Sequence, residues 1–261
     1  MSVKTEQRAK KIVQVLLRHG NASVDDLVSM LGASAPSIRR DLARLEQRNL
    51  VHRTHGGARL AEQMQYEAFR FDSSFQVRES RFAEEKRRIG MAAAELIREH
   101  DTVGFTAGTT PTQVARCIRH RNSIHVITNA VNIAMELSNQ PALNVTLTGG
   151  TMRWAGAFSL TGPIAVEMLN SVFLDTVFIG ACGVDPQCGV TTIEPDEAAV
   201  FRAMVRQAKQ VVVVADSSKI SMVSPALICP AGEIDILVTD SGIAPDALRA
   251  FRARDIEVHA V

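Results

Sequence analysis

The sequence predicts an α/β protein of two domains: a small helical domain over residues 1–60 and a larger α/β domain with a mostly parallel sheet over residues 83–261, joined by a connector over 61–82. Three observations support this. Three short amphipathic helical patterns fill the first 60 residues, seven β-rich runs alternate with helical stretches later, and positive charge gathers at the N-terminus. A chain of 261 residues is long enough for two domains, and 46% hydrophobic residues exclude a disordered chain.

Net charge differs between the two predicted domains. The whole chain has 29 Lys and Arg against 28 Asp and Glu, a net charge of +1, which alone would argue against a polyanionic partner. Residues 1–60, however, hold 11 basic against 5 acidic residues, a net charge of +6, which leaves −5 for residues 61–261. This asymmetry indicates that the N-terminal domain meets a polyanion.

The N-terminal domain is predicted to contain three helices. An apolar stripe over residues 6–19 predicts the first, and Ser23 begins a capping-box pattern before a short second helix. Gly32 supplies a turn, and Ser34 is placed to cap a third helix over 35–47. The apolar residues expected to face the core are Ile12, Val13, Leu16, Leu17, Leu27, Val28, Leu31, Ile38, Leu42 and Leu45.

Two helices joined by a glycine turn match a helix-turn-helix, whose second helix would enter the major groove of DNA. Such a helix needs short polar side chains near base edges and arginines that contact phosphates. A hairpin over 50–60 with a Gly-Gly turn would add a basic wing. The alternative, a solvated arginine face, is less favoured because the basic excess and the wing coincide with it. The predicted DNA-contacting residues are Ser34, Ser37, Arg39, Arg40, Arg44, Arg53 and His55.

The residues around this predicted recognition helix resemble a known family. Residues 34–46 read SAPSIRRDLARLE, and residues 53–58 read RTHGGA. Together they are similar to the N-terminal signature of DeoR-type bacterial transcription regulators. The resemblance implies winged-helix binding to double-stranded operator DNA, usually by an oligomer at repeated operator sites. It also implies regulation of carbohydrate catabolism, often as a repressor.

The larger domain is predicted to alternate strands with helices, beginning with a helix over 84–99. This alternation favours a mostly parallel sheet, and the all-apolar run Val211–Ala215 is typical of a strand covered on both faces. The predicted strands are Thr102–Thr106, Ile124–Thr128, Val145–Thr148, Asp175–Ile179, Val211–Ala215, Ile234–Thr239 and Ile256–His259, and further helices are expected near 111–119, 130–138, 162–170, 195–209 and 245–253.

Small, polar and charged residues gather after the ends of these strands, where α/β sheets bind ligands. A Gly-Thr-Thr turn at 108–110 opens a helix and offers backbone N–H groups and hydroxyls to a phosphate. Arg153 or Lys219 would neutralise that phosphate, and amide and carboxylate groups would bond sugar hydroxyls. Taken singly, each has an ordinary interpretation as a helix cap, turn residue or surface ion pair. The predicted effector-binding residues are Gly108, Thr109, Thr110, Asn129, Gly149, Gly150, Arg153, Glu194, Asp216 and Lys219.

The resemblance to the DeoR family extends into this domain. Its C-terminal sensor domain is similar to sugar-phosphate isomerases and coenzyme A transferases, which implies a phosphorylated sugar or a related metabolite as the effector. Two positions depart from the family pattern: Thr106 stands where an acid is common, and Phe201 stands where a lysine is common. The segments that carry the resemblance are the Gly-Thr-Thr turn, Thr128-Asn129, Gly149-Gly150, Gly180 with Gly183, Glu197-Ala198 and Asp216 to Lys219.

These patterns predict a sequence-specific DNA-binding regulator that represses a carbohydrate-catabolism operon, responds to a phosphorylated sugar and is not an enzyme. The alternative is a sugar-phosphate isomerase-like enzyme with a DNA-binding head, but no sequence feature fixes a catalytic geometry and no catalytic residue is assigned. The four cysteines, His52 and His55 lack metal-ligand spacing, so neither metal nor cofactor is expected. Without a visible secretory signal or membrane-length apolar run, we expect a cytoplasmic homo-oligomer.

Overall fold

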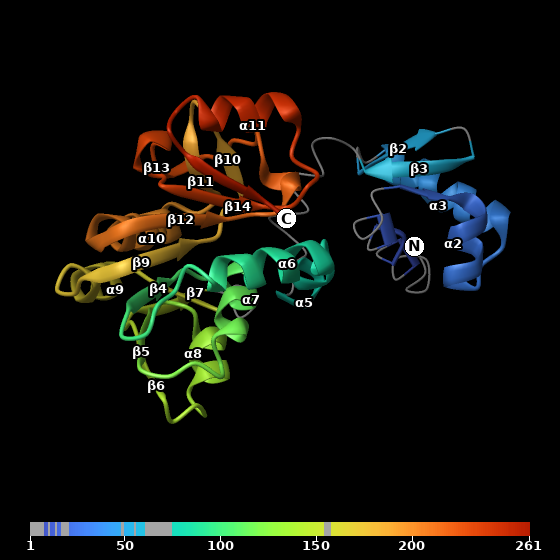
Figure 1. Ribbon diagram of the computed structural model, residues 1–261. Coiled ribbons are helices and arrows are strands. Elements are labelled where there is room, and N and C mark those ends of the chain that lie inside the picture. The colour runs from blue at the N-terminus through green and yellow to red at the C-terminus, as the bar shows by residue number, and fades with distance from the viewer. Residues whose placement is uncertain are drawn as a thin grey trace. The chain divides into compact units, whose positions relative to one another are not determined.

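The computed structural model describes residues 8–9, 11–13, 15–16, 21–47, 50–54, 56–60, 75–153 and 158–261. The chain forms two compact units, Met1–Arg81 and Phe82–Val261 (Figure 1). We refer to them as the head and the α/β unit. Each has its own cluster of buried apolar side chains, so each has a core of its own.

The head combines helices with a three-stranded antiparallel sheet of order β1-β3-β2. The described residues between 8 and 16 are helical, as predicted for the first helix. The third helix has the predicted bounds, and β2 and β3 confirm the hairpin. After the first helix, the elements of the head are β1 (Asn21–Ser23), α2 (Val24–Leu31), α3 (Ala35–Gln47), β2 (Val51–Thr54) and β3 (Gly57–Leu60). Its core consists of Ile12, Leu16, Val24, Leu27, Ile38, Leu42, Leu45, Val51 and Ala58.

Local signals fix the ends of α2. The Ser23 hydroxyl accepts a hydrogen bond from the Asp26 N–H at 3.0 Å, and the Asp26 carboxylate accepts one from the Ser23 N–H at 3.1 Å. This reciprocal pair is the predicted capping box. Gly32 ends the helix at φ +61°, a left-handed conformation in which a side chain would be strained. The turn between α2 and α3 therefore follows from the sequence.

The strand β1 is a feature that the sequence patterns did not predict. It pairs with β3, with Ala22 opposite Ala58. Gly57 permits this approach, because a Cβ atom there would lie 2.3 Å from the Ala22 carbonyl oxygen. The second glycine of the Gly56-Gly57 pair thus serves strand packing, whereas Gly56, at φ +96°, serves the hairpin turn.

The predicted connector, residues 61–82, lies partly outside the described residues, which resume at Phe75. Its last part forms the helix α5 (Phe75–Ser80), for which the sequence showed no clean period. The boundary between the two compact units falls directly after this helix.

The α/β unit is built on a seven-stranded sheet of order β15-β14-β12-β9-β4-β5-β6, in which every neighbouring pair is parallel (Figure 1). All seven predicted strands are present, with ends that differ by up to three residues. They are β4 (Thr102–Phe105), β5 (Ile124–Thr128), β6 (Leu143–Leu147), β9 (Leu174–Ile179), β12 (Ala208–Val214), β14 (Ile236–Thr239) and β15 (Glu257–Ala260). The run Val211–Ala215 is buried, as expected of a central strand.

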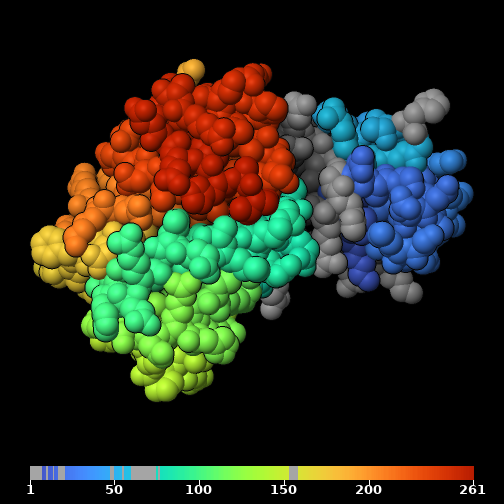
Figure 2. Space-filling model, viewed as in Figure 1, coloured from blue at the N-terminus to red at the C-terminus, as the bar shows by residue number. Residues whose placement is uncertain are grey.

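Six helices accompany this sheet: α6 (Ala83–Ala94), α7 (Thr109–Cys117), α8 (Val131–Leu137), α9 (Pro163–Leu169), α10 (Pro195–Gln207) and α11 (Pro245–Arg252). Since parallel crossovers are right-handed, the reversal of strand order at β4 and β9 places α7 and α8 on one face of the sheet and α10 and α11 on the other. Figure 2 shows α11, in red, at the surface. Among the described residues, no helix is long and apolar enough to cross a membrane.

Two small antiparallel sheets complete the α/β unit, and the sequence predicted neither. One has the order β10-β11-β13, from Gly183–Asp185, Gly189–Thr192 and Ala226–Cys229. The other pairs β7 (Thr151–Arg153) with β8 (Ser159–Thr161). Both follow carboxyl ends of main-sheet strands, so they add to the edge of the sheet where ligand sites are expected.

Candidate DNA-binding and effector-binding sites

The helix α3 divides into a buried and an exposed face. Ile38 and Leu42 are almost fully buried in the core of the head. Arg39, Arg40 and Arg44, which the sequence predicted as DNA contacts, are exposed. This division follows from the 3.6-residue period of the helix. It leaves three guanidinium groups on the helix that a helix-turn-helix inserts into the major groove.

The two predicted serines meet at the N-terminus of α3. Ser34 precedes the helix and its carbonyl accepts the Ile38 N–H at 3.0 Å. The hydroxyls of Ser34 and Ser37 lie 2.9 Å apart within hydrogen-bond distance, and Ser34 is exposed. They present short polar groups at the end of the helix that reads base edges.

The wing is attached to α3 through one acidic side chain. The Arg53 N–H donates to Glu46 Oε1 at 3.1 Å, and Arg53 Nη1 lies 3.9 Å from Glu46 Oε2. Because both side chains remain more than 40% exposed, the Arg53 guanidinium keeps access to solvent and to a phosphate. His55, the last predicted DNA contact, lies outside the described residues.

The α/β unit has a topological switch point between β4 and β9, where successive strands are added on opposite sides. Thr106 bridges these strands: its hydroxyl accepts the Gly180 N–H at 2.9 Å and donates to the Phe178 carbonyl at 3.4 Å. The residue that departs from the family pattern is thus fully buried and joins the two strands. Phe201, the other departure, is buried in the core, where a lysine would be costly.

The Gly-Thr-Thr turn lies at this switch point. Gly108 and Thr109 are half-buried, whereas Thr110 is buried. A Cβ atom on Gly180 would lie 2.9 Å from Pro111 Cδ, so the glycine lets the end of β9 approach the start of α7 closely. The first hydrogen bond within α7 runs from the Thr112 N–H to the Gly108 carbonyl, so the N–H groups of the preceding turn point out of the helix. This geometry suits an anion.

Asn129 connects the turn to a distant strand. Its side chain is fully buried, and Oδ1 accepts the Ala107 N–H at 3.0 Å. Its Nδ2 donates to Ser159 Oγ at 3.0 Å and to the Leu160 carbonyl at 3.1 Å. Both donors of the amide are therefore used within the protein, and the predicted contact with a sugar hydroxyl stays a prediction.

Asp216 is also buried, with only 1% of its surface exposed. Its Oδ1 accepts hydrogen bonds from the N–H and the hydroxyl of Ser218, and its Oδ2 lies 3.9 Å from the Nζ of Lys86. Lys86, on α6, is buried as well, and the sequence patterns did not single it out. The Asp216 carboxylate, predicted to bind a sugar hydroxyl, thus has partners within the protein. Lys219 ends the short helical turn Ser217–Lys219 and is half-exposed.

The remaining predicted residues lie at other strand ends. Gly149 and Gly150 follow β6 and are exposed, and Glu194 precedes α10 at its N-cap position. Arg153 ends β7, but its side chain lies outside the described residues. The ends of β6 and β12 are four strand spacings apart, roughly 19 Å, and the Gly-Thr-Thr turn lies between them. The predicted residues therefore form two groups on either side of that turn.

The described His, Cys, Asp and Glu residues form no metal-ligand cluster, and two of the four thiols have raised pKa values. Within the described parts of the chain, no three His, Cys, Asp or Glu residues are grouped so that they would hold a metal ion. All four cysteines are free thiols. Burial raises the pKa of the Cys229 thiol to about 12, and burial also raises the pKa of Cys117. Because the thiolate is the nucleophilic form, the raised pKa values make these two thiols less reactive.

Each of the two units matches a known protein family. A family model described as the DeoR-like helix-turn-helix domain matches residues 8–64, and one described as the DeoR C-terminal sensor domain matches residues 81–241. The chain belongs to the DeoR family of transcription regulators. The head is accordingly a DNA-binding domain of this family and the α/β unit is its sensor domain.

Three relatives of DeoR type match nearly the full chain. The transcriptional repressor GlcR of Bacillus subtilis is 35% identical over 90% of this chain and 88% of its own length. The transcriptional regulator GlpR of Haloferax volcanii is 34% identical over 97% and 96%. A protein of Escherichia coli O157:H7, whose name proposes repression of the aga operon, is 32% identical over 97% and 93%. All three are named as regulators of transcription.

Proposed function

We propose that this regulator is a homo-oligomeric repressor of a carbohydrate operon, and that a phosphorylated sugar controls it by binding at the switch point of the α/β unit. Two of the three relatives are named as repressors, which supports repression. The observation that carries the effector site is the Gly-Thr-Thr turn, whose Gly108 and Thr109 are half-buried at the switch point between β4 and β9. Open α/β sheets bind their ligands at such switch points.

In this proposal the turn binds the phosphate. The N–H groups at the start of α7 point toward the anion, and the helix dipole favours negative charge there. Lys219 neutralises the phosphate. The rest of the effector contacts the other predicted residues on either side of the turn, which are Gly149, Gly150, Arg153 and Glu194. Asn129 and Asp216 position the site from beneath, because their polar atoms already bond within the protein.

The unit senses the sugar phosphate and does not transform it. The contacts of the buried Asp216 carboxylate with Ser218 and Lys86 support sensing over acid–base catalysis. Effector binding favours one arrangement of the oligomer and operator DNA favours another. A coupling free energy of about 1–3 kcal/mol between the two sites would change operator affinity roughly 5–150-fold.

The experiment is a thermal-shift screen with sugar phosphates and, as controls, the same sugars without phosphate. A ligand that binds the folded state raises the melting temperature. Lys219→Met should abolish the shift, whereas Lys209→Met, an exposed lysine at the other end of β12, should retain it. Absence of any shift across the panel would contradict the proposed effector class. Turnover of a sugar phosphate that stops in Lys219→Met would instead favour an isomerase-like enzyme.

A further inference from the structure

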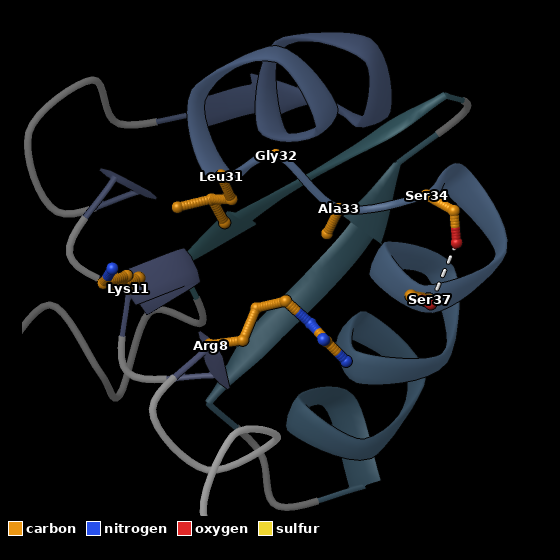
Figure 3. Close-up of a pocket in the computed structure, with 7 residues that line it drawn as sticks. All are labelled: Arg8, Lys11, Leu31, Gly32, Ala33, Ser34 and Ser37. Carbon is orange, nitrogen blue, oxygen red and sulfur yellow. Dashed lines mark hydrogen bonds between the residues drawn. The ribbon is translucent and has the colours of Figure 1, made fainter.

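A polar pocket lies in the head where three elements meet: the first helix, the turn between α2 and α3, and the first turn of α3 (Figure 3). Its volume is about 280 Å³. Arg8 and Lys11 come from the first helix, Leu31 from the end of α2, Gly32 to Ser34 from the turn, and Ser37 from α3. Neither basic residue was among the DNA contacts predicted from the sequence.

The lining of this pocket suits an anion. Its charged members are two cations, and its other side chains with polar groups are the hydroxyls of Ser34 and Ser37. Among the described residues that line it, none is acidic. Guanidinium and ammonium groups beside hydroxyls are the donors that proteins use for phosphate oxygens. The pocket volume is larger than a single phosphate group needs.

A buried carboxylate orients Arg8 in this pocket. Arg8 Nε donates to Asp41 Oδ2 at 2.6 Å, and Asp41, on α3, has only 1% of its side chain exposed. Arg44 Nη1 lies 4.0 Å from the other oxygen, Asp41 Oδ1. A guanidinium has five N–H groups, and only the one on Nε bonds within the described residues. The four N–H groups on the two Nη atoms thus remain available to a ligand.

The cost of burying a carboxylate indicates a geometric role for this pair. Ion pairs with a buried member contribute little net stability, because desolvation offsets their attraction. The bond instead fixes the first helix to α3 and fixes the direction of the Arg8 guanidinium. A ligand held by this guanidinium therefore has a defined position relative to the recognition helix.

We propose that this pocket binds one phosphate of the DNA backbone through Arg8 and Lys11, and that Asp41 is the positioning residue that orients Arg8. The phosphate belongs to the DNA that α3 reads, because Ser34 and Ser37 line the pocket at the N-terminal end of that helix, the end that contacts base edges in helix-turn-helix proteins. The contact sets the register of α3 in the groove and carries no base specificity of its own.

The test measures how DNA affinity depends on salt, with the full-length chain and a labelled duplex of arbitrary sequence. Each neutralised phosphate contributes about 0.9 to the slope of log affinity against log salt concentration. Arg8→Met and Lys11→Met should each reduce the slope by up to about 1. The double variant should also lose about 1 and not 2, because both side chains contact the same phosphate. Arg254→Met, an exposed arginine of the α/β unit, is the matched control and should leave the slope unchanged.

The positioning role is tested by Asp41→Asn, which makes the head more positive by one charge. If charge alone governed binding, this variant would bind DNA more tightly. We expect the opposite: a slope reduced as in Arg8→Met, because the guanidinium loses its anchor. If Asp41→Asn does not fold, Arg8→Lys provides the test. A single ammonium group does not reach Asp41 and the phosphate together, so the salt slope of this variant should also fall by about 1.

Two results would overturn the proposal. One is an unchanged salt slope in the double variant of Arg8 and Lys11 whose melting temperature matches the wild type. The other is a double variant that keeps its DNA slope but loses a thermal stabilisation by inorganic phosphate, which would make the pocket a site for a free anion. Tighter DNA binding by Asp41→Asn would refute the positioning role alone.

Discussion

The predicted DNA-contacting residues and the predicted effector-binding residues differ in burial. On α3, Arg39, Arg40 and Arg44 are exposed, and Arg44 also lies 4.0 Å from the Asp41 carboxylate. At the strand ends of the α/β unit, Asn129 and Asp216 are buried and already bond within the protein. A groove of DNA is read by side chains on a convex surface, whereas a small ligand is held by a concave site whose shape buried polar groups maintain. Substitutions should therefore affect binding in the head and stability in the α/β unit.

The largest effect is expected from Asp216→Ala. Removing this carboxylate breaks its 3.9 Å ion pair with the buried Lys86 ammonium, and breaking a buried ion pair costs about 3–5 kcal/mol. Urea unfolding of the full chain measures the loss. In the double variant with Lys86→Met the loss should be smaller than in Asp216→Ala. The control is Asp246→Ala, whose exposed carboxylate pairs with Arg249, and a similar loss in that control would contradict the burial argument.

A smaller loss of stability is expected from Asn129→Ala. The change leaves the Ala107 N–H, the Ser159 hydroxyl and the Leu160 carbonyl without the amide that bonds them. An unsatisfied buried polar group costs about 1–3 kcal/mol. Thermal and urea unfolding should both report the loss, together with weaker binding of any sugar phosphate that stabilises the wild type. Full stability with weakened binding would mean that Asn129 contacts the ligand directly.

Arg40→Ala should separate binding from stability in the head. The side chain is exposed, so the free energy of unfolding should change by no more than about 0.5 kcal/mol. Operator affinity should fall by about 1–3 kcal/mol, roughly 5–150-fold, as expected for a base or phosphate contact. The operator is obtained by selecting random duplexes with the wild-type protein, and affinity is measured by fluorescence anisotropy. Normal operator binding would refute the assignment of α3 as the recognition helix.

The smallest effect concerns pH. The hydrogen bond from Lys209 Nζ at 2.7 Å, with a second from the Thr102 N–H, lowers the pKa of the Asp175 carboxyl. A lowered pKa in the folded state stabilises the protein above the unfolded pKa, and this stabilisation is lost as the pH falls through the folded value. Lys209→Met should therefore reduce stability at pH 7 slightly and leave it unchanged at pH 2. Because Lys209 is largely exposed, a large difference would contradict the account.

The sequence predicted the main elements because their signals are local. The helix α3 follows from its apolar period, and the seven parallel strands follow from short apolar runs between helices. The strand β1 was missed because it depends on pairing Ala22 with Ala58, which no local pattern encodes. Lys86 was missed because a lysine in the stretch Glu84 to Arg88 is typical of an exposed helix face, and its partner Asp216 is 130 residues away.

The effector site itself stays a prediction, but the structure shows where its predicted members lie. The Gly-Thr-Thr turn lies at the switch point of the sheet, beyond the carboxyl end of β4. Whether a polar side chain contacts the ligand or holds the site in place depends on its hydrogen bonds with segments distant in the sequence. Asn129, for example, bonds to Ser159 and Leu160 of β8, a strand that the sequence did not reveal.

We propose that a sugar phosphate bound at the Gly-Thr-Thr turn changes the affinity of the head for operator DNA. The most direct measurement is an operator titration at increasing concentrations of the sugar phosphate that most stabilises the wild type, with Lys219→Met in parallel. The account predicts a shift of operator affinity of roughly 5–150-fold in the wild type and none in Lys219→Met, which should still bind the operator. Operator affinity that is the same at zero and saturating sugar phosphate in the wild type would contradict it.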